Sequence, residues 1–358
     1  MRIALLGNAA ALHTRRWARA LAARGVVVRV FSLEAALPDD EPPPLDDERL
    51  PSWPLPRVLR YPLARAATSR ALTAFGPDLV EAHFVPNYGF LGALAGRHPL
   101  VVHAWGSDLL RSPGRSPFHA ARARYALARA DLVVVDAPVL ADAARGLGVD
   151  PARLEVAPWG ADLARFPLAP AAVAPHVVSL RQLEPIYDVA CLVDALPAVH
   201  AAVPGLRVTI AGEGHLRSRL EAQVRARGVA ACVRFVGRLP HAALPALLAS
   251  AATVVSCARS DSTSISLLEA MASGATPVVT DLAGNRAWVS DGVEGRLFAV
   301  GDSAALAGTL IATLGDAAFR ATARIAARRR VEAEGDFDRA VDRVLARYGM
   351  LVARGVAA

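Results

Sequence analysis

Short apolar runs and stretches of helical spacing alternate from the start of this chain. Residues 3–7 form an apolar run that opens into a turn, residues 13–24 have helical spacing through Trp17 and Leu21, and residues 26–32 are apolar again. A strand, a helix and a second strand in this order are typical of a parallel sheet with helical crossovers. The beginning of the chain therefore predicts a doubly wound α/β domain.

The same alternation continues through the first half of the chain and begins again at His176. With 358 residues, the chain is long enough for two domains that each bury a core. Further strands are expected at 78–83, 100–103, 131–135, 177–180, 206–211, 233–237, 253–256 and from Pro277, and helices at 60–75, 87–94, 138–147, before Gly274, and at 304–314, 317–334 and 336–354. The pattern thus predicts two successive α/β domains with parallel sheets.

Two segments lack this periodicity. Residues 38–56 are acidic and rich in proline, which predicts a surface loop. Residues 167–175 contain three prolines among alanines, which predicts a linker between the domains. The expected domain boundary therefore lies at 170/171.

The composition is that of a globular protein, with 54% hydrophobic and 20% charged residues. All 40 basic residues are arginine, and alanine is abundant, so the excess of arginine reflects a coding bias and does not by itself indicate anion recognition. The net charge of +7 is spread over both halves, which argues against a nucleic-acid partner. Peripheral contact of a basic face with an anionic membrane stays open beside a plain solvated surface.

The cysteines and the apolar runs bear on the compartment. Cys191, Cys232 and Cys257 are odd in number, far apart and without C-x-x-C spacing, which argues against a disulfide framework or a zinc site. No signal-peptide pattern precedes the first strand, and no apolar run reaches about 18 residues. We therefore expect a cytoplasmic protein, with the inner membrane face as its one candidate membrane contact.

The stretch 253–281 carries the clearest chemistry. It has the pattern strand, loop, helix, loop, strand, with Ser266-x-x-Glu269 at capping-box spacing and Gly274 at the helix end. The loop-to-helix junction, residues 263–266, leaves backbone N–H groups unpaired at the positive end of a helix dipole, which suits a phosphate. Asp261 and Glu269 bracket this junction with a carboxylate on each side.

The pair Asp261-x7-Glu269, followed by AMASG-x-x-PVV, resembles the E-x7-E signature of retaining glycosyltransferases of the GT-B fold, particularly family 4, with Asp in place of the first Glu. In that family the first carboxylate faces the donor sugar and the second holds the nucleotide ribose. The resemblance implies a catalytic role for Asp261 and donor binding by Glu269. It also implies donor binding by the junction residues Thr263, Ser264, Ile265 and Ser266. A capped helix with a solvated acidic face is the alternative.

Other stretches of the second half match the same family. Arg181 follows the expected strand 177–180 and resembles the diphosphate-clamping Arg, although Ile186 or Tyr187 stands where the family has a Lys. A plain surface Arg is the alternative there. The Gly212 turn lets backbone approach a ligand. The loop of Gly237, Arg238 and Leu239 matches the one that meets the nucleobase through backbone groups.

The first half contributes His103-Ala-Trp-Gly-Ser-Asp108, which is similar to the H-x-x-G-x-D element of family 4, where the His lies near the donor sugar. His103 is thus a candidate catalytic residue, or else a buried, hydrogen-bonded His. Asp108 is expected on the acceptor side. Asn8 and His13 follow the first strand, where the family has a loop facing the cleft, although His13 also suits a plain helix start. The absence of G-x-G-x-x-G argues against a dinucleotide-dependent dehydrogenase.

The resemblance implies a GT-B enzyme. Its two Rossmann-like domains would be an acceptor-side domain at 1–170 and a nucleotide-sugar-binding domain at 171–335, with parallel sheets facing the cleft between them. A C-terminal helix, 336–358, would pack back on the first domain. The implied reaction is retaining transfer of a sugar from a nucleotide-sugar donor to a glycan, a lipid-linked or a small-molecule acceptor.

The implied catalysis needs neither a metal nor a cofactor. Arg181 and the amides of 263–266 would stabilise the departing diphosphate, and the single D-x-D, residues 336–338, opens the last helix. Two alternatives stay open: a nucleotide-sugar epimerase on the same fold, and a nucleotide-sugar-binding protein of weak activity, which Asp261 and the missing Lys would suit.

Overall fold

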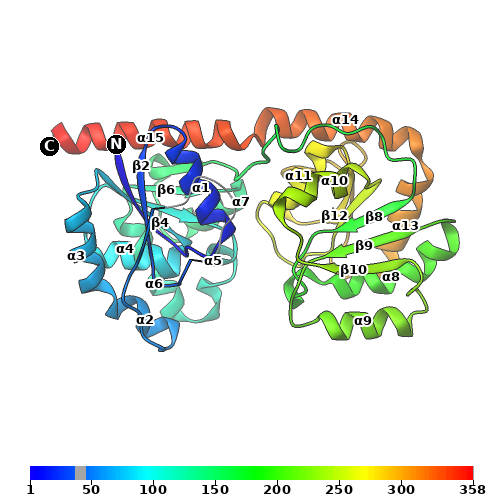
Figure 1. The fold of residues 1–358 in the computed structure, drawn as a ribbon, viewed down its shortest axis with the longest axis horizontal. Coiled ribbons are helices and arrows are strands. Elements are labelled where there is room, and N and C mark those ends of the chain that lie inside the picture. Colours follow the sequence, from blue (N-terminus) through cyan, green and yellow to red (C-terminus); the bar gives the residue numbers. More distant parts are fainter. Residues whose placement is uncertain (37–45, 358) are drawn as a thin grey trace. The chain divides into compact units, whose positions relative to one another are not determined.

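The computed structural model describes residues 1–36 and 46–357 and contains two compact units (Figure 1). The first unit comprises Met1–Ala157 and Asp338–Ala358, and the second comprises Pro158–Phe337. Residues 158–170 belong to the second unit because Ala161 forms a bridge with Asp336 and Arg328 donates to the Phe166 carbonyl at 2.7 Å. The division between residues 157 and 158 therefore falls 13 residues before the boundary at 170/171 that the sequence predicts.

The first unit is built on a seven-stranded parallel sheet with the order β3-β2-β1-β4-β5-β6-β7. Its strands are β1 (Arg2–Leu6), β2 (Val27–Ser32), β3 (Asp47–Arg49), β4 (Leu79–His83), β5 (Leu100–Ala104), β6 (Leu132–Val135) and β7 (Leu154–Val156). In β1, residues of both alternating sets, such as Leu5 and Leu6, are 0% exposed. Both faces of the sheet are thus covered, as in doubly wound folds.

The helices of the first unit are α1 (Leu12–Ala22), α2 (Arg57–Leu63), α3 (Arg65–Phe75), the π-helix η1 (Phe84–Gly89), α4 (Phe90–Ala95), α5 (Ser107–Leu110), the 3-10 helix η2 (Pro113–Arg115), α6 (Pro117–Arg129), α7 (Pro138–Gly146), the 3-10 helix η3 (Pro151–Arg153) and α15 (Phe337–Ala357). The expected helix 60–75 is two helices: α2 contains Pro62 in its last turn, and Ala64 separates it from α3. The expected helix 87–94 begins earlier, as the π-helix at Phe84.

The acidic segment 38–56 is only partly a loop, so that prediction was wrong for β3. Asp47–Arg49 pairs with β2, and Leu50 N–H donates to the Ser32 carbonyl at 2.7 Å. A charged edge strand lacks the apolar pattern by which strands are recognised, although its charges suit an edge. Residues 38–45 of the predicted loop lie outside the described residues.

The second unit contains a six-stranded parallel sheet with the order β10-β9-β8-β11-β12-β13. Its strands are β8 (His176–Ser179), β9 (Arg207–Ala211), β10 (Val233–Gly237), β11 (Thr253–Ser256), β12 (Thr276–Thr280) and β13 (Arg296–Phe298). Its helices are η4 (Pro185–Tyr187), α8 (Val189–Ala202), α9 (Arg217–Ala226), η5 (His241–Ala243), α10 (Leu244–Ala249), α11 (Ile265–Ser273), α12 (Ala283–Arg286), α13 (Ser303–Gly315) and α14 (Ala317–Glu334). The prediction of two parallel-sheet, Rossmann-like domains is confirmed.

Two segments that join the units pair with each other. Ala161 N–H donates to the Gly335 carbonyl at 2.7 Å, and Phe337 N–H donates to the Ala161 carbonyl at 3.1 Å. Gly160 has a φ of +58°, and a Cβ on it would lie 2.4 Å from Phe337 N, so only glycine fits this close approach.

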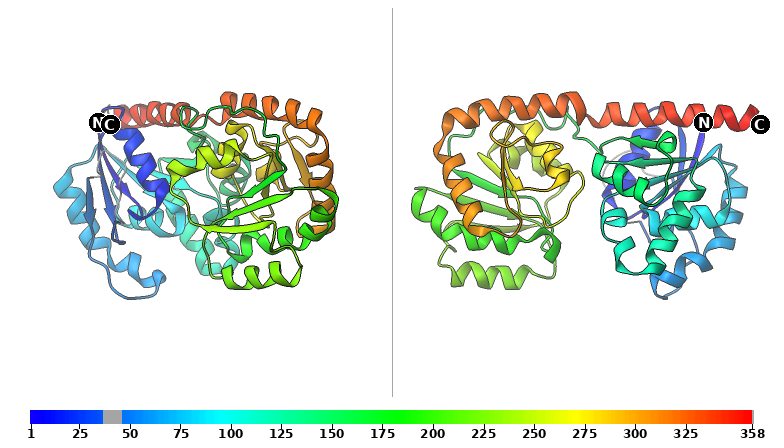
Figure 2. Two further views of the ribbon diagram at one scale, coloured as in Figure 1. Left: turned by 45° about the vertical axis from the view of Figure 1, so that its right-hand side comes forward. Right: turned by 180° about the vertical axis from the view of Figure 1, so that it is seen from behind.

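Helix α15 then lies alongside α1 in the first unit, as Figures 1 and 2 show in red and dark blue. Arg24, just after α1, forms an ion pair with Asp338 of α15 at 2.9 Å. Over the described residues, no helix is long and apolar enough to span a bilayer.

Candidate functional site

The polar loop before α11 in the second unit gathers the residues with the clearest sequence signal. Strands β8 and β11 are neighbours in the sheet, so their carboxyl ends lie side by side. Arg181, after β8, donates from Nη1 to Ser264 Oγ at 2.7 Å, and its Nη2 forms an ion pair with Asp261. Its guanidinium also stacks 4.6 Å from the ring centre of Tyr187. The structure thus brings Arg181, Asp261 and Ser264 together; we call Arg181 with residues 261–266 the donor loop.

The N-cap of α11 is Ser264, so the predicted capping box at Ser266 was wrong. Ser264 Oγ accepts from Leu267 N–H at 3.3 Å, and Leu267 cannot return a side-chain bond as Glu would. Ile265 and Ser266 are the first two residues of the helix, and their N–H groups therefore have no intrahelical acceptor. Together with the helix dipole, they make this end of α11 attractive to an anion.

Glu269 lies in the second turn of α11 and is only 3% exposed. Its Oε1 is 2.8 Å from His241 Nε2, and the His241 ring packs edge-on against Phe166 with ring centres 5.4 Å apart. A buried carboxylate needs such a partner. The sequence analysis did not single out His241. The one sequence feature that could have indicated it is its position shortly after the Gly237 loop.

Gly212 shapes the path of the Arg181 segment. A Cβ on Gly212 would lie 2.1 Å from the Arg181 carbonyl oxygen, and the φ of +157° is one that other residues rarely adopt. The Gly212 N–H donates to the Gly237 carbonyl at 2.8 Å, which links this turn to the predicted nucleobase loop. In that loop Arg238 is exposed and Leu239 is half-buried. The candidate donor residues of β8, β9, β10 and α11 thus share one edge of the second sheet.

In the first unit, His103 belongs to a buried polar cluster with Glu81, His83 and Tyr348. His83 Nε2 lies 2.7 Å from Glu81 Oε1, and His103 Nε2 lies 3.2 Å from that oxygen and 2.7 Å from the Tyr348 hydroxyl. All four side chains are at most 3% exposed. Burial lowers the pKa of His83 and of His103 to about 3 and raises the pKa of Glu81. Both imidazoles are therefore neutral at neutral pH, and Tyr348 anchors α15 to the cluster.

Glu81, His83 and His103 also bear on the expectation of no metal. Their possible ligand atoms lie within 4.8 Å of one another. Among the described residues, these three form the one group of His, Cys, Asp or Glu side chains that is close enough together to hold a metal ion. One atom of each residue, namely Glu81 Oε1, His83 Nε2 and His103 Nε2, is already engaged in a hydrogen bond or close polar contact within the cluster. The cluster thus has a structural explanation, and the metal-free expectation remains a prediction.

Asp108 is 0% exposed and joins two loops of the first unit. Its Oδ2 accepts from Val85 N–H at 3.1 Å, after β4, and its Oδ1 accepts from Trp105 N–H at 3.0 Å, after β5. Burial raises its pKa to about 6, against the opposing effect of the backbone donors. The Asp108 side chain therefore fixes the backbone of the loops at this edge of the sheet. If Asp108 contributes to acceptor binding, it does so by holding these loops in place.

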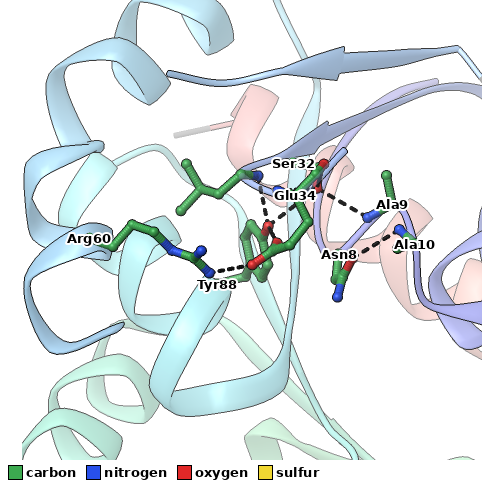
Figure 3. A network of polar contacts seen from close by, with 8 residues as sticks. Asn8, Ala9, Ala10, Ser32, Glu34, Arg60 and Tyr88 are labelled. Atoms are coloured by element: carbon green, nitrogen blue, oxygen red, sulfur yellow. Dashed lines mark hydrogen bonds and ion pairs between the residues drawn. The ribbon is translucent and has the colours of Figure 1, made fainter. Parts of the chain in front are cut away.

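Asn8 lies in the turn after β1, where a network of polar contacts holds the backbone (Figure 3). Asn8 Oδ1 accepts from Ala10 N–H at 2.9 Å, and Ser32 Oγ accepts from Ala9 N–H at 3.1 Å. The network continues through Tyr88, whose hydroxyl accepts from Leu33 N–H at 2.8 Å and donates to Glu34, and through Arg60, which pairs with Glu34. It thereby joins the ends of β1 and β2 to η1 and α2.

His13 lies on the first turn of α1, edge-on to Trp105 with ring centres 5.3 Å apart. Burial lowers the pKa of His13 to about 4. Trp105 in turn packs against His83, with ring centres 5.0 Å apart. The predicted first-unit residues therefore lie at the carboxyl ends of two strands that flank β4 in the sheet: Asn8 and His13 follow β1, and His103 and Asp108 lie at the end of β5. The sequence analysis missed Glu81, His83 and Tyr348, although polar residues inside the apolar run LVEAH were a signal.

Comparison with known families assigns both halves of the chain. Residues 8–160 match the "Glycosyl transferase 4-like domain", and residues 163–330 match "Glycosyl transferases group 1". Among curated relatives, a glycogen synthase of Mycobacterium tuberculosis is 33% identical over 50% of this chain and 44% of its own length. A phosphatidyl-myo-inositol mannosyltransferase of Mycobacterium leprae is 38% identical over 37% of this chain and 34% of its own. The matches thus span less than half the length of these relatives.

Solved structures of the same fold cover almost the whole chain. A sucrose-phosphate synthase from Thermosynechococcus elongatus has a TM-score of 0.85 at 21% identity, covering 99% of this chain and all of its own. HepE from Anabaena, solved in complex with UDP, has a TM-score of 0.82 at 20% identity, covering 98% of this chain and all of its own. The two family matches and this shared fold show that the chain belongs to the glycosyltransferases of the GT-B fold, of the family 4-like type.

Proposed function

We propose that this protein is a retaining glycosyltransferase that moves a sugar from a nucleotide-sugar donor to an acceptor without a metal ion. The observation that carries the proposal is the donor loop, where Arg181 meets Asp261 and Ser264 at the N-terminus of α11. A cation with a two-pronged fork beside a helix N-terminus suits a diphosphate. The structures of HepE with UDP and with UDP-glucose support a nucleotide-sugar donor on this fold.

The proposed catalysis is electrostatic. As the bond between the sugar and the diphosphate stretches, negative charge grows on the diphosphate oxygens. Arg181 and the N–H groups of Ile265 and Ser266 are already positioned to stabilise that charge, so little reorganisation is needed at the moment of reaction. The ion pair with Asp261 holds the guanidinium in place until the diphosphate binds. We assign no nucleophile for the retention of configuration.

The two carboxylates have different proposed roles. Asp261 is 18% exposed and lies before the helix, and we assign to it the contact with the donor sugar. Glu269 accepts the ribose hydroxyls, because a carboxylate can take two hydrogen bonds from a diol. His241 keeps one Glu269 oxygen in position through the 2.8 Å contact. His103 of the first unit keeps its proposed catalytic role, and Tyr348 holds its ring.

The acceptor in this proposal is a glycan, a lipid-linked molecule or a small molecule. The names of two relatives refer to glycogen, which is a glycan, and to phosphatidyl-myo-inositol, which is a lipid. Contact with the inner face of a membrane belongs to the lipid-linked case and is part of the same proposal.

The test is incubation of the full chain with a panel of nucleotide sugars, with and without candidate acceptors, in buffer containing a chelator. Mass analysis detects transfer, chromatography resolves isomers, and NMR of the product gives the anomeric configuration. We expect transfer with retention. Interconversion of nucleotide sugars without transfer would show an epimerase, binding without turnover would show a binding protein, and an inverted product or a strict metal requirement would refute the mechanism.

A further inference from the structure

A cavity of about 680 Å³ opens in the first unit at the carboxyl ends of β4 and β5. The π-helix η1, the short helices α5 and η2, and the helix α6 form its walls. Its size is in the range of pockets that hold small organic ligands. The proposed catalysis uses none of its lining side chains, so the cavity needs an explanation of its own.

The lining is strongly cationic. Arg111, Arg115, Arg122 and His119 contribute to it, and no Asp or Glu among the described residues does. Arg111, Arg115 and Arg122 also form no ion pair with a carboxylate in the part of the chain that the structure describes. Many other arginines of this protein do, such as Arg24 with Asp338. The bias toward arginine explains an arginine on a surface, but it does not explain a cavity that lacks carboxylates.

Arg122 is the strongest single observation. It is only 5% exposed, its Nη2 donates to the Pro86 carbonyl, and its guanidinium lies 4.6 Å from the ring centre of Phe90. Its Nε is buried and has no hydrogen-bond partner. A buried cation with an unused donor is costly unless an anion compensates it. Arg122 thus lines the cavity as a largely buried cation that forms no ion pair with a carboxylate among the described residues.

The backbone around the cavity is held in unusual conformations. Phe84 has a φ of +71°, which is uncommon for a non-glycine residue, and it begins a π-helical turn, a form often found at functional sites. The Asp108 carboxylate fixes this turn through Val85 N–H and fixes the next loop through Trp105 N–H. Such strain persists only where the surroundings enforce it. The buried Asp108 thus fixes the backbone of the two segments that begin this side of the cavity.

We propose that this cavity binds a phosphate group of the acceptor. Guanidinium groups pair with oxyanions through two parallel hydrogen bonds, and three of them with a His match the charge of a phosphate better than that of a single carboxylate. The remaining volume and the side chains of Phe84 and Asn87 suit a hydroxylated body attached to the phosphate. The acceptor class is thus a phosphorylated sugar or polyol, free or as a lipid headgroup. The identification of the ligand as the acceptor rests on the proposed function. The assignment of a phosphate site does not depend on it.

The first experiment measures binding of glucose 6-phosphate, inorganic phosphate and glucose to the full chain by calorimetry, without any nucleotide sugar. We expect binding of the two phosphates and none of glucose. Arg111→Gln and Arg115→Gln should each weaken phosphate binding about tenfold, and Arg122→Gln by more, because hydrogen bonds to charged groups are lost. Arg124→Gln is the matched control, since Arg124 is exposed on the same helix and does not line the cavity.

Arg111 and Arg115 are exposed, so their variants should fold, and a thermal melt checks Arg122→Gln. Equal phosphate affinity in the wild type and the three cavity variants, or no phosphate binding at all, would overturn the proposal. In a second arm, vesicles of phosphatidylglycerol that retain the wild type but not Arg115→Gln would identify a lipid headgroup. Binding of glucose 6-phosphate without retention by these vesicles would identify a free sugar phosphate. Vesicles of phosphatidylcholine are the control for both.

The outcome is separable from that of the proposed function. If phosphate binds in the cavity but no sugar is transferred to any acceptor, the phosphate site stands and glycosyl transfer fails. If transfer proceeds equally well to neutral acceptors in the wild type and in Arg115→Gln, glycosyl transfer stands and the acceptor-phosphate assignment fails.

Discussion

The donor loop of the second unit and the buried polar cluster of the first unit both lie at the carboxyl ends of parallel strands, but different interactions hold them. The donor loop is partly exposed, and Arg181 contacts a carboxylate that a ligand can replace. The polar cluster is closed to solvent, and His103 is held by Tyr348, a residue 245 positions later in the chain. A replaceable contact suits ligand binding, whereas a closed one suits stability. Changes in the donor loop should therefore affect turnover, and changes in the cluster should affect unfolding.

The largest expected effect is that of Arg181→Ala on turnover. Removing one preorganised donor to a developing charge should lower the rate about a hundredfold or more. The unfolding free energy should also fall, by about 1–3 kcal/mol, because the guanidinium is only 10% exposed and its removal ends the Asp261 ion pair, the Ser264 hydrogen bond and the stacking on Tyr187. Rates measured under saturating donor, with a denaturant titration of the same samples, check both expectations.

Arg219→Ala is the control for this prediction, because Arg219 is exposed on α9 in the same unit. Addition of Mg²⁺ should leave the wild type unchanged. Turnover that survives Arg181→Ala would show that the diphosphate is bound elsewhere. The donor loop would then not be the site that supports turnover.

The acid dependence of stability should report on the buried cluster. The pKa of His83 and of His103 is about 3 in the folded protein, below the ordinary value of 6.5, so the unfolded chain binds protons first as the pH falls. Their contribution is fully present above pH 6.5 and is lost toward pH 3. Between pH 7 and pH 5, each buried histidine should reduce the unfolding free energy by about 2 kcal/mol.

His83→Gln isolates this effect, since Gln can bond Glu81 but does not titrate. Its loss of unfolding free energy between pH 7 and pH 5 should be smaller than that of the wild type by about 2 kcal/mol. His215→Gln, at an exposed position, should behave as the wild type. Asp108 acts in the opposite direction, because its pKa is raised to about 6, and it contributes equally in all three proteins. Identical pH profiles for His83→Gln and the wild type would show that the cluster does not titrate with unfolding.

The next expected effect sharpens the division of roles within the donor loop itself. Glu269→Gln should weaken binding of a nucleoside diphosphate about tenfold, because one charged hydrogen-bond acceptor is lost. Asp261→Asn removes a carboxylate from the same site and should lower turnover while leaving that affinity nearly unchanged. Calorimetry with UDP and other nucleoside diphosphates measures both variants. Unchanged affinity in Glu269→Gln for every nucleotide tested would contradict the ribose assignment.

The same contrast explains which parts could be predicted from the sequence. Most of the strands and the helix of Glu269 follow from local patterns, because a strand end or a helix start is encoded within a few residues. The short strands β3, β7 and β13 were not expected. The helix cap was predicted at Ser266 but lies at Ser264. Both residues are serines, which are favoured at a helix N-cap, and the backbone conformation decides between them.

Contacts between distant residues could not be predicted in this way. Tyr348 is one aromatic residue of an amphipathic helix in sequence, and its contact with His103 exists only once α15 has packed on the first sheet. His241 is likewise joined to Glu269 across 28 residues, and no spacing rule covers that distance. The charged strand β3 and the π-helix at Phe84 lack any apolar period, so tertiary pairing alone explains them.

The smallest expected effect is that of Tyr348→Phe, which removes one hydroxyl from the buried cluster and nothing else. The ring keeps its packing, but His103 Nε2 and Glu81 lose a hydrogen-bond partner, and buried polar atoms left unsatisfied cost about 1–2 kcal/mol of unfolding free energy. Tyr125→Phe is the control, because Tyr125 is half-buried in the same unit and its hydroxyl makes no hydrogen bond to the described residues. Denaturant unfolding at pH 7 measures both. An equal, small loss in the two variants would mean that α15 is held by its apolar face and its ion pairs alone. A loss confined to Tyr348→Phe would show that the helix is anchored at the residue expected to face the donor sugar.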